Sequence, residues 1–180
     1  MIILGIDPGS RKAGYALIEK EGRRLKLLHS GTLRYDSEEE FLYRLGTIFD
    51  SLTAVCETHR PQEVAFESLI YVKSVTALAK LAQARGAMVA ACLKTSKAKL
   101  FEYSPNLVKS TVAGHGHAPK EGVNKALQLL YGKLDLKSLD ESDALAVATC
   151  HALLGGKPAV TAGRGRSLSQ VFKNYGKEKS

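Results

Sequence analysis

The first nine residues constrain the fold more than any other segment. The stretch Ile2–Ile6 is an unbroken apolar run, and an Asp-Pro-Gly turn ends it at once. A short apolar run that is bounded by a turn is typical of a buried strand. We therefore expect a strand over residues 2–7, with the carboxylate of Asp7 at its C-terminal end.

The rest of the pattern predicts a three-layer α/β domain with a five-stranded mixed sheet and helices on both faces. Short spacers make the first three strands an antiparallel meander. The fourth strand follows a helix, so it should lie parallel to the first. Ser37 and Glu40 have capping-box spacing and are expected to start that helix, which Pro61 ends. The remaining elements are strands at 13–20, 25–35, 63–67 and 100–103, and helices at 75–93, 105–113, 120–132 and 139–154.

Length and composition place these elements in one domain. The 180 residues suit a single core over residues 1–155, followed by a flexible basic tail at 156–180. No apolar segment approaches the roughly 18 residues of a membrane span, and no signal peptide is visible, so we expect a cytoplasmic protein. The three cysteines match neither a disulfide framework nor a zinc site, and they are interpreted as buried thiols: Cys56, Cys92 and Cys150.

The formal charge of +8 is unevenly distributed along the chain. Residues 157–180 contain six Lys and Arg against one Glu, and residues 73–125 contain nine Lys and Arg against Glu102 and Glu121. The stretch from residue 36 to 57 is acidic. A domain polarised in this way suits a polyanion such as nucleic acid on one face, although charge alone is weak support for that partner.

Two carboxylates stand at strand ends. Asp7 and Glu67 each follow an apolar run. If their strands are parallel neighbours, both side chains emerge at one edge of the sheet, where open α/β sheets usually bind ligands. Simpler readings exist, because Asp7 could cap its own turn and Glu67 could face solvent.

Two more carboxylates begin the last helix. Asp140 and Asp143 are three residues apart, so they project from one face. Asp140 could serve only the helix dipole, next to a capping box formed by Ser138 and Glu141. Asp143 directly precedes the apolar stretch 144–148, where an unpaired carboxylate would cost a few kcal/mol.

Four such acids together form a plausible hard-oxygen site. Magnesium prefers a few carboxylates, retained waters and the phosphate oxygens of a substrate. Two ions about 4 Å apart can activate a water and stabilise the departing oxygen of a phosphodiester. The predicted chemistry is therefore in-line hydrolysis of a phosphate ester.

Several segments together resemble one family. The RuvC family of Holliday-junction resolvases, the crossover junction endodeoxyribonucleases, has similar motifs in the same order across about residues 2–155. The matching segments are Ile3–Ser10 with Gly14–Ala16, Val64–Ser68, Gln83–Gly86 and Asp140–Ala146.

This resemblance implies a ribonuclease H-like fold and a homodimer that places two active sites on a four-way DNA junction. Paired symmetric nicks would leave 5′-phosphate and 3′-hydroxyl ends, in homologous recombination and DNA repair. The implied cofactor is Mg²⁺, with two ions per subunit and Mn²⁺ as a substitute. The implied partners are the RuvA and RuvB branch-migration proteins, and no membrane is involved.

The resemblance also implies roles for individual residues. The four metal-binding acids of the family fall on Asp7, Glu67, Asp140 and Asp143, and its functional lysines fall on Lys109 and Lys120, which we count with the acids as catalytic. Without the resemblance, each lysine would be read as a solvated side chain. DNA contacts are expected from Tyr71, Lys73, Lys80, Lys109 and Lys120.

The loop after the acidic strand departs from the family. An aromatic that inserts at the junction centre is common there, whereas this chain has Leu69, Ile70 and Tyr71. That role could fall to Tyr71, which can stack on a base, to Ile70, or to neither. His115 and His117 look like a ligand pair, but they lie in a glycine-rich loop without rigid geometry, and we interpret them as part of a DNA-contacting loop.

Three rival functions remain open at this point. An Asp-Pro-Gly-Ser turn after a strand also occurs in actin-like and sugar-kinase ATPases, but those need a second such lobe, which this chain lacks. A ribonuclease H-like nuclease could act on RNA instead of DNA. A binding module without catalysis is the third, and the intact set of four acids argues against it.

Overall fold

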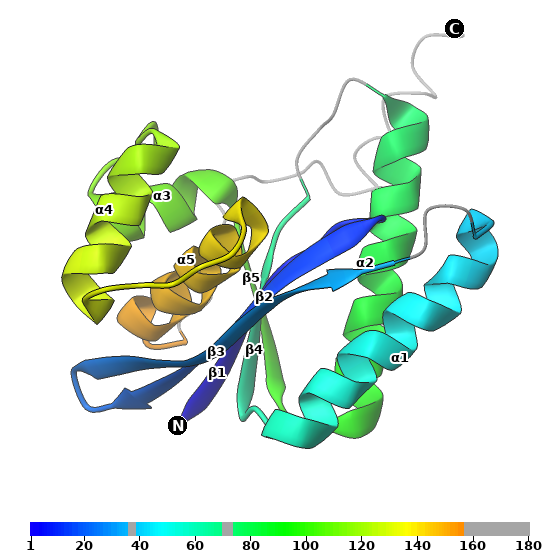
Figure 1. Cartoon of the computed structure of the whole chain (residues 1–180), viewed down its shortest axis with the longest axis horizontal. Coiled ribbons are helices and arrows are strands. Elements are labelled where there is room, and N and C mark those ends of the chain that lie inside the picture. The colour runs from blue at the N-terminus through cyan, green and yellow to red at the C-terminus, as the bar shows by residue number, and fades with distance from the viewer. Residues whose placement is uncertain (36–38, 70–73, 157–180) are drawn as a thin grey trace, which may run out of the picture.

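In the computed structural model, residues 1–35, 39–69 and 74–156 are described, and they form five strands and five helices (Figure 1). Ile70, Tyr71 and Lys73 lie outside the described residues, and so do the roles predicted for them. The predicted tail lies outside the described residues from residue 157 onward. The elements in chain order are β1 (Ile2–Asp7), β2 (Lys12–Glu21), β3 (Arg24–Arg34), α1 (Phe41–His59), β4 (Glu63–Glu67), α2 (Val75–Thr95), β5 (Lys99–Tyr103), α3 (Pro105–Ala113), α4 (Lys120–Tyr131) and α5 (Leu139–Leu154).

The strands form one mixed sheet in the order β3-β2-β1-β4-β5. Strands β1, β2 and β3 are antiparallel neighbours, whereas β4 pairs with β1, and β5 with β4, in parallel. Both the predicted meander and the predicted parallel alignment of the fourth strand are confirmed. The two strands whose ends carry Asp7 and Glu67 are therefore direct neighbours.

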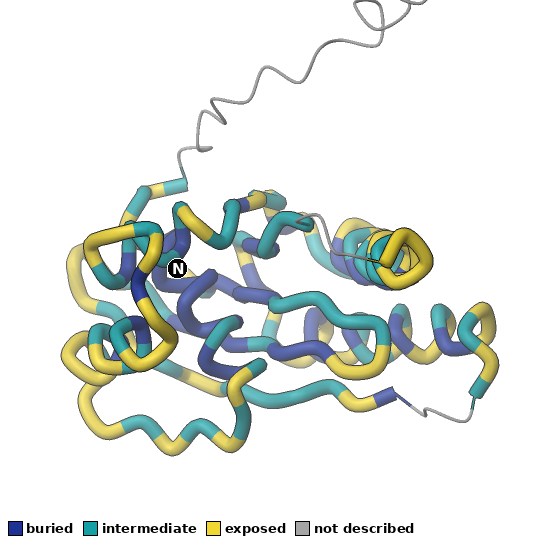
Figure 2. The backbone as a smooth tube through the Cα atoms, turned by 90° about the horizontal axis from the view of Figure 1, so that it is seen from above, coloured by how far each residue is buried: buried dark blue, intermediate teal, exposed yellow. Residues whose placement is uncertain are grey.

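Helices cover both faces of this sheet, as predicted (Figure 1). Helices α1 and α2 pack over one face, and α3, α4 and α5 lie over the other. Successive side chains of a strand point to opposite faces of the sheet, so they belong to two separate cores. Ile3 and Ile18 lie in the core on the α5 side, and Leu4 and Leu17 lie in the core on the α1–α2 side. Figure 2 shows the buried strands running between the two helical layers.

Helix α5 lies unusually close to the sheet. Its residues 144–148 are all buried. Two glycines allow this approach, because a Cβ atom at Gly5 would lie 2.3 Å from the carbonyl oxygen of Ala144, and one at Gly14 would lie 2.0 Å from that of Asp140. Real Cβ atoms do not tolerate such distances. Main-chain contact therefore sets the position of α5 over β1 and β2.

The predicted start of the first helix needs a correction. Helix α1 begins at Phe41 with Glu40 at its N-cap, and Glu40 makes no side-chain capping hydrogen bond. Glu40 therefore does not occupy the third helical position of a capping box, and Ser37 lies outside the described residues. Half of the second predicted box is present, since Ser138 caps α5 by accepting a hydrogen bond of 3.2 Å from the main-chain N–H of Glu141. The Glu141 carboxylate accepts its main-chain hydrogen bond from Lys137, one residue before the N-cap.

The cysteines lie in the interior of the described part of the chain. All three cysteines are buried free thiols, as predicted, and the Sγ atoms of Cys56 and Cys92 lie 3.7 Å apart. Within the described ranges, no helix combines the length and the apolar character that a membrane crossing requires.

Candidate active site

The first two predicted acids meet at one edge of the sheet. Asp7 is the last residue of β1 and Glu67 the last of β4. The parallel register pairs Ile6 with Phe66, the residues directly before them. Adjacent parallel strands that end together place both carboxylates side by side, so the sequence-based expectation for this edge is confirmed.

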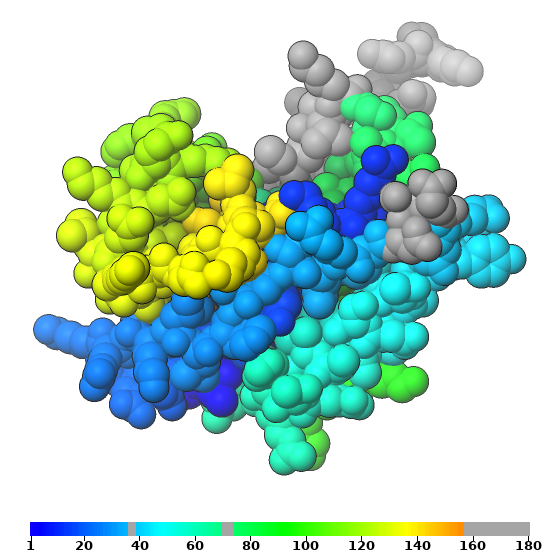
Figure 3. All heavy atoms as spheres, viewed as in Figure 1, coloured from blue at the N-terminus to red at the C-terminus, as the bar shows by residue number. Residues whose placement is uncertain are grey.

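The first turn of α5 brings the other two acids to the same edge. Asp140 lies against Gly14 of β2, and Gly14 is the register partner of Asp7. Asp143 follows one turn later in the capped helix. In the space-filling view, the yellow start of α5 borders the blue strands at the molecular surface (Figure 3).

Electrostatics show that the four carboxylates act on one another. Burial raises the pKa of Asp7 from its ordinary value of 3.8 to about 7, and repulsion by the other three acids, led by Glu67, adds to the effect. Burial also raises the pKa of Glu67, with Asp143 as the repelling charge. Clustered, partly desolvated carboxylates of this kind are characteristic of functional sites.

Two predicted lysines offset part of this negative charge. The Nζ atom of Lys120 donates a hydrogen bond of 2.8 Å to Asp143 Oδ2. This contact raises the pKa of Lys120, so its ammonium form is favoured. The positive charges of Lys109 and Lys120 both lower the pKa of Glu67. The structure therefore brings both lysines into the electrostatic range of the acids.

A third lysine at the site was not predicted from the sequence. The Nζ atom of Lys12, the first residue of β2, lies 2.5 Å from Asp140 Oδ2. The available signal was its place just after the Asp-Pro-Gly-Ser turn. An antiparallel hairpin returns that position to the end of β1.

The residues fit a divalent cation by their chemistry. Four mutually repelling carboxylates supply hard oxygen ligands and a local negative charge, and Mg²⁺ and similar ions prefer such ligands. The side chains are not yet arranged as a binding group: in the part of the chain that the structure describes, no three His, Cys, Asp or Glu residues are placed to hold a metal ion. Both aspartates of α5 instead face lysines.

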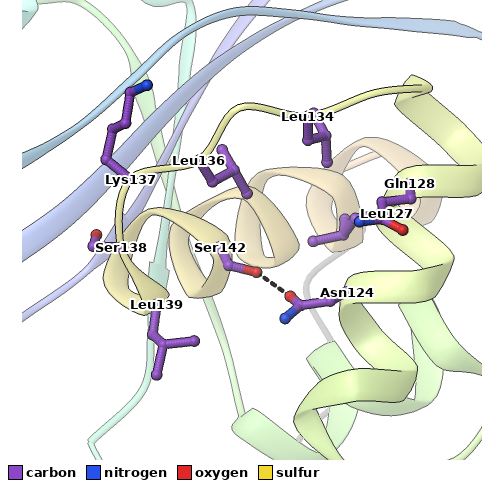
Figure 4. Close-up of a pocket in the computed structure, with 9 residues that line it drawn as sticks. All are labelled: Asn124, Leu127, Gln128, Leu134, Leu136, Lys137, Ser138, Leu139 and Ser142. Atoms are coloured by element: carbon purple, nitrogen blue, oxygen red, sulfur yellow. Dashed lines mark hydrogen bonds between the residues drawn. The ribbon is translucent and has the colours of Figure 1, made fainter.

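A hydrogen bond between α4 and α5 supports the Lys120–Asp143 contact. Ser142 donates from its hydroxyl to Asn124 Oδ1, beside a cavity of about 380 Å³ between α4 and the start of α5 (Figure 4). Asn124 lies one turn after Lys120, and Ser142 is next to Asp143. This bond therefore fixes the two helices that carry the ion pair relative to each other.

The remaining predicted residues lie away from these contacts. Lys80 is exposed on α2, with its Nζ atom 5.4 Å from the centre of the Phe41 ring. His115 and His117 are exposed in the loop between α3 and α4. Within the described ranges, neither histidine belongs to a group of three or more His, Cys, Asp or Glu residues that could hold a metal ion.

The sequence analysis also missed a buried polar cluster at the opposite ends of the same elements. His151, near the end of α5, has 0% exposure and contacts two side chains at 2.7 Å each: Glu63 Oε2 through Nε2 and the Tyr103 hydroxyl through Nδ1. A neutral imidazole satisfies both contacts by donating to Glu63 and accepting from Tyr103.

The sheet topology and the acids at its edge define a class, the ribonuclease H-like nucleases. The sequence model described as "Crossover junction endodeoxyribonuclease RuvC" matches residues 3–151. The chain therefore belongs to the RuvC family, whose members are metal-dependent nucleases.

Individual relatives agree with this assignment. The chain is 42% identical to the crossover junction endodeoxyribonuclease RuvC of Geobacter sulfurreducens over 152 residues, which cover 84% of this chain and 92% of the relative. It is 41% identical to that of Trichlorobacter lovleyi, covering 97% and 99% of the two chains.

Solved structures agree as well. Thermus thermophilus RuvC in complex with a Holliday junction substrate superposes with a TM-score of 0.80 at 30% identity, covering 87% of this chain and 95% of that one. The yeast mitochondrial Holliday junction resolvase has a TM-score of 0.65 at 14% identity, covering 84% and 77%, and shares the fold.

Proposed function

We propose that this protein resolves Holliday junctions by paired symmetric nicks, through metal-dependent hydrolysis of DNA phosphodiesters. The observation that carries the proposal is the convergence of four carboxylates from three separate elements at one edge of the sheet, where the other three repel Asp7. Repulsion of this kind is unfavourable in a protein that never binds a cation. Family membership identifies the class of reaction that such a site serves.

The proposed ligands are the four acids, and the proposed ions are two Mg²⁺ per subunit, with Mn²⁺ able to replace them. When bound, the ions supply a Lewis acid and a water that is more easily deprotonated. Asp7 must lose its proton before it can bind a cation, and its raised pKa means that protons compete for the same oxygens near neutral pH. The proposed ligands are Asp7, Glu67, Asp140 and Asp143.

Lysines supply positive charge next to these acids. Lys120 is held beside Asp143, so its ammonium group is positioned to bind a phosphate oxygen at the site. Lys109 acts on Glu67 from α3 and can offset charge from the other side. We propose catalytic roles for both lysines, and further DNA contacts by Lys80, Tyr71 and Lys73.

Two active sites are needed to cut two strands of a four-way junction. The proposal therefore includes a homodimer, whose two-fold symmetry matches that of the junction. We propose that the reaction occurs in the cytoplasm with RuvA and RuvB as partners. The basic tail at 156–180 would add a further polyanion contact.

The test is cleavage of a synthetic four-way junction in Mg²⁺ by the wild-type chain and by Asp7→Asn. The variant removes one proposed ligand with almost no change in shape, so cleavage should fall at least about a hundredfold. Junction binding, measured by gel shift in a metal chelator, should stay within about threefold, because phosphate contacts come mainly from the basic surface.

The matched control is Asp135→Asn, an exposed aspartate that pairs with Lys137 away from the site. This control should cleave like the wild type. Duplex DNA and structured RNA serve as competing substrates. Preferential cleavage of RNA would replace the proposal with a ribonuclease, and equal loss of binding and cleavage in Asp7→Asn would contradict the proposed separation of roles.

A further inference from the structure

The ammonium group of Lys12 lies against Asp140, one of the proposed metal ligands. Its Nζ atom donates a hydrogen bond of 2.5 Å to Asp140 Oδ2. The Asp140 side chain is 19% exposed, whereas that of Lys12 is 53% exposed. The carboxylate is therefore largely fixed by the fold, while the ammonium group is reached from solvent on a flexible stem.

Each of the two aspartates of α5 forms an ion pair with a lysine. Lys12, from β2, pairs with Asp140, and Lys120, from α4, pairs with Asp143. Both acids sit in a cluster that repels Asp7, yet no ready metal-binding group is present among the described residues. Ion pairs with lysine explain how these acids can cluster without forming a metal-binding group. Each ammonium group neutralises one carboxylate and holds that side chain toward the lysine.

We propose that Lys12 is a positioning residue that acts as a built-in competitor of the catalytic metal: its ammonium group occupies Asp140 in the metal-free protein and is displaced when a divalent cation binds. This inference rests on the proposed function, because it needs Asp140 to be a metal ligand. Once displaced, the ammonium group is free to bind a phosphate of the DNA. DNA and metal then favour each other's binding through this one side chain.

A purely structural role explains Lys12 less well. Exposed ion pairs contribute little to folding, commonly below about 1 kcal/mol. The fold also holds the Asp140 backbone against Gly14 without any help from Lys12. A divalent ion that contacts several carboxylates interacts more strongly at this position than a single ammonium group on a solvated stem. Displacement of the Lys12 ammonium group by the ion is therefore favourable.

The experiment measures Mn²⁺ binding to the full chain without DNA, by electron paramagnetic resonance of the free ion. Loss of the competitor in Lys12→Gln should tighten Mn²⁺ binding about three- to fivefold, the range expected from the small net value of such pairs. Lys12→Arg keeps a competing cation and should bind within about twofold of the wild type. Loss of a merely structural contact would change affinity in the opposite direction or leave it unchanged.

Lys137→Gln is the matched control. Lys137 forms an ion pair of the same length, 2.5 Å, with Asp135, but both side chains are exposed and lie outside the acid cluster. This variant should leave Mn²⁺ affinity unchanged. Lys12→Met serves as a second uncharged variant and must tighten binding as Lys12→Gln does, with heat unfolding used to confirm that both are folded.

The coupling to DNA gives a second readout. A four-way junction that carries no cleavable phosphate at the crossover should tighten Mn²⁺ binding in the wild type more than in Lys12→Gln. The inference is overturned if Lys12→Gln binds Mn²⁺ equally or more weakly while Asp140→Asn still abolishes binding, and in that case the proposed metal site stands. If the wild type binds no Mn²⁺ and cuts no junction, both the inference and the proposed function fail.

Discussion

Strand β4 carries a glutamate at each end, and the two carboxylates have different surroundings. At the start of β4, Glu63 contacts the buried His151, and each ring nitrogen of that histidine has a partner. At the end of β4, Glu67 faces other acids, and burial raises its pKa. Helix α5 spans the same two regions, with His151 near its end and Asp143 near its start.

Structural and functional polar groups can be distinguished by whether their charges are satisfied within the fold. Around His151, burial lowers the histidine pKa and keeps the imidazole neutral, so one donor and one acceptor match two partners. Around Asp7, burial and charge act in the same unfavourable direction. The first arrangement stabilises the fold by itself, whereas the second is costly until a cation binds. We therefore assign function to the repelling end.

The largest expected effect is the difference in junction cleavage between substitutions at the two glutamates of β4. Glu67→Gln should lower junction cleavage in Mg²⁺ by at least about a hundredfold, because it removes a proposed ligand, without lowering thermal stability. Glu63→Gln should lose about 1 kcal/mol of unfolding free energy and less than about tenfold in cleavage, because the amide still accepts a hydrogen bond from His151. Cleavage assays and urea unfolding check both variants, and a larger cleavage loss in Glu63→Gln would reverse the assignment.

An intermediate effect is expected from His151→Ala. Removal of the imidazole leaves the Glu63 carboxylate and the Tyr103 hydroxyl without their partner and opens a cavity in the core. The free energy of unfolding in urea should fall by about 3 kcal/mol. His115→Ala, at an exposed position, is the control and should change stability by less than about 0.5 kcal/mol. Equal stability of both variants would mean that the buried cluster contributes nothing.

A further effect is the pH dependence of stability that Asp7 produces at the end of β1. The pKa of Asp7 is about 7 in the folded chain against an ordinary 3.8, so the folded state holds this proton more tightly. Its contribution to stability is complete below about pH 4 and is lost as the pH rises to about 7. Unfolding free energies in a metal chelator, wild type minus Asp7→Asn, should therefore decrease across that window. Added Mg²⁺ should flatten the curve, and a difference that rises with pH would contradict the repulsion.

Much of the site follows from sequence because its geometry obeys simple rules. Parallel neighbours place Asp7 and Glu67 at one edge, and a spacing of three places Asp140 and Asp143 on one helix face. Local rules failed at α1, where the expected capping box does not determine the observed helix start at Phe41.

These rules did not predict contacts between residues that are far apart in the sequence. Glu63 and His151 are 88 residues apart, and Lys12 and Asp140 are 128 residues apart. Their contacts depend on how far α5 slides along the sheet, and periodicity does not encode that distance. The sign of the charge was visible in the sequence, but the partner of each charge was not.

The two glycines under α5 limit which substitutions this enzyme can tolerate. Because main-chain atoms of the helix rest directly on β1 and β2 at Gly5 and Gly14, the helix is located by two fixed points of backbone contact. A single methyl group added at Gly14 would meet the Asp140 carbonyl oxygen at 2.0 Å, so it would lift the helix and separate Asp140 from Asp7.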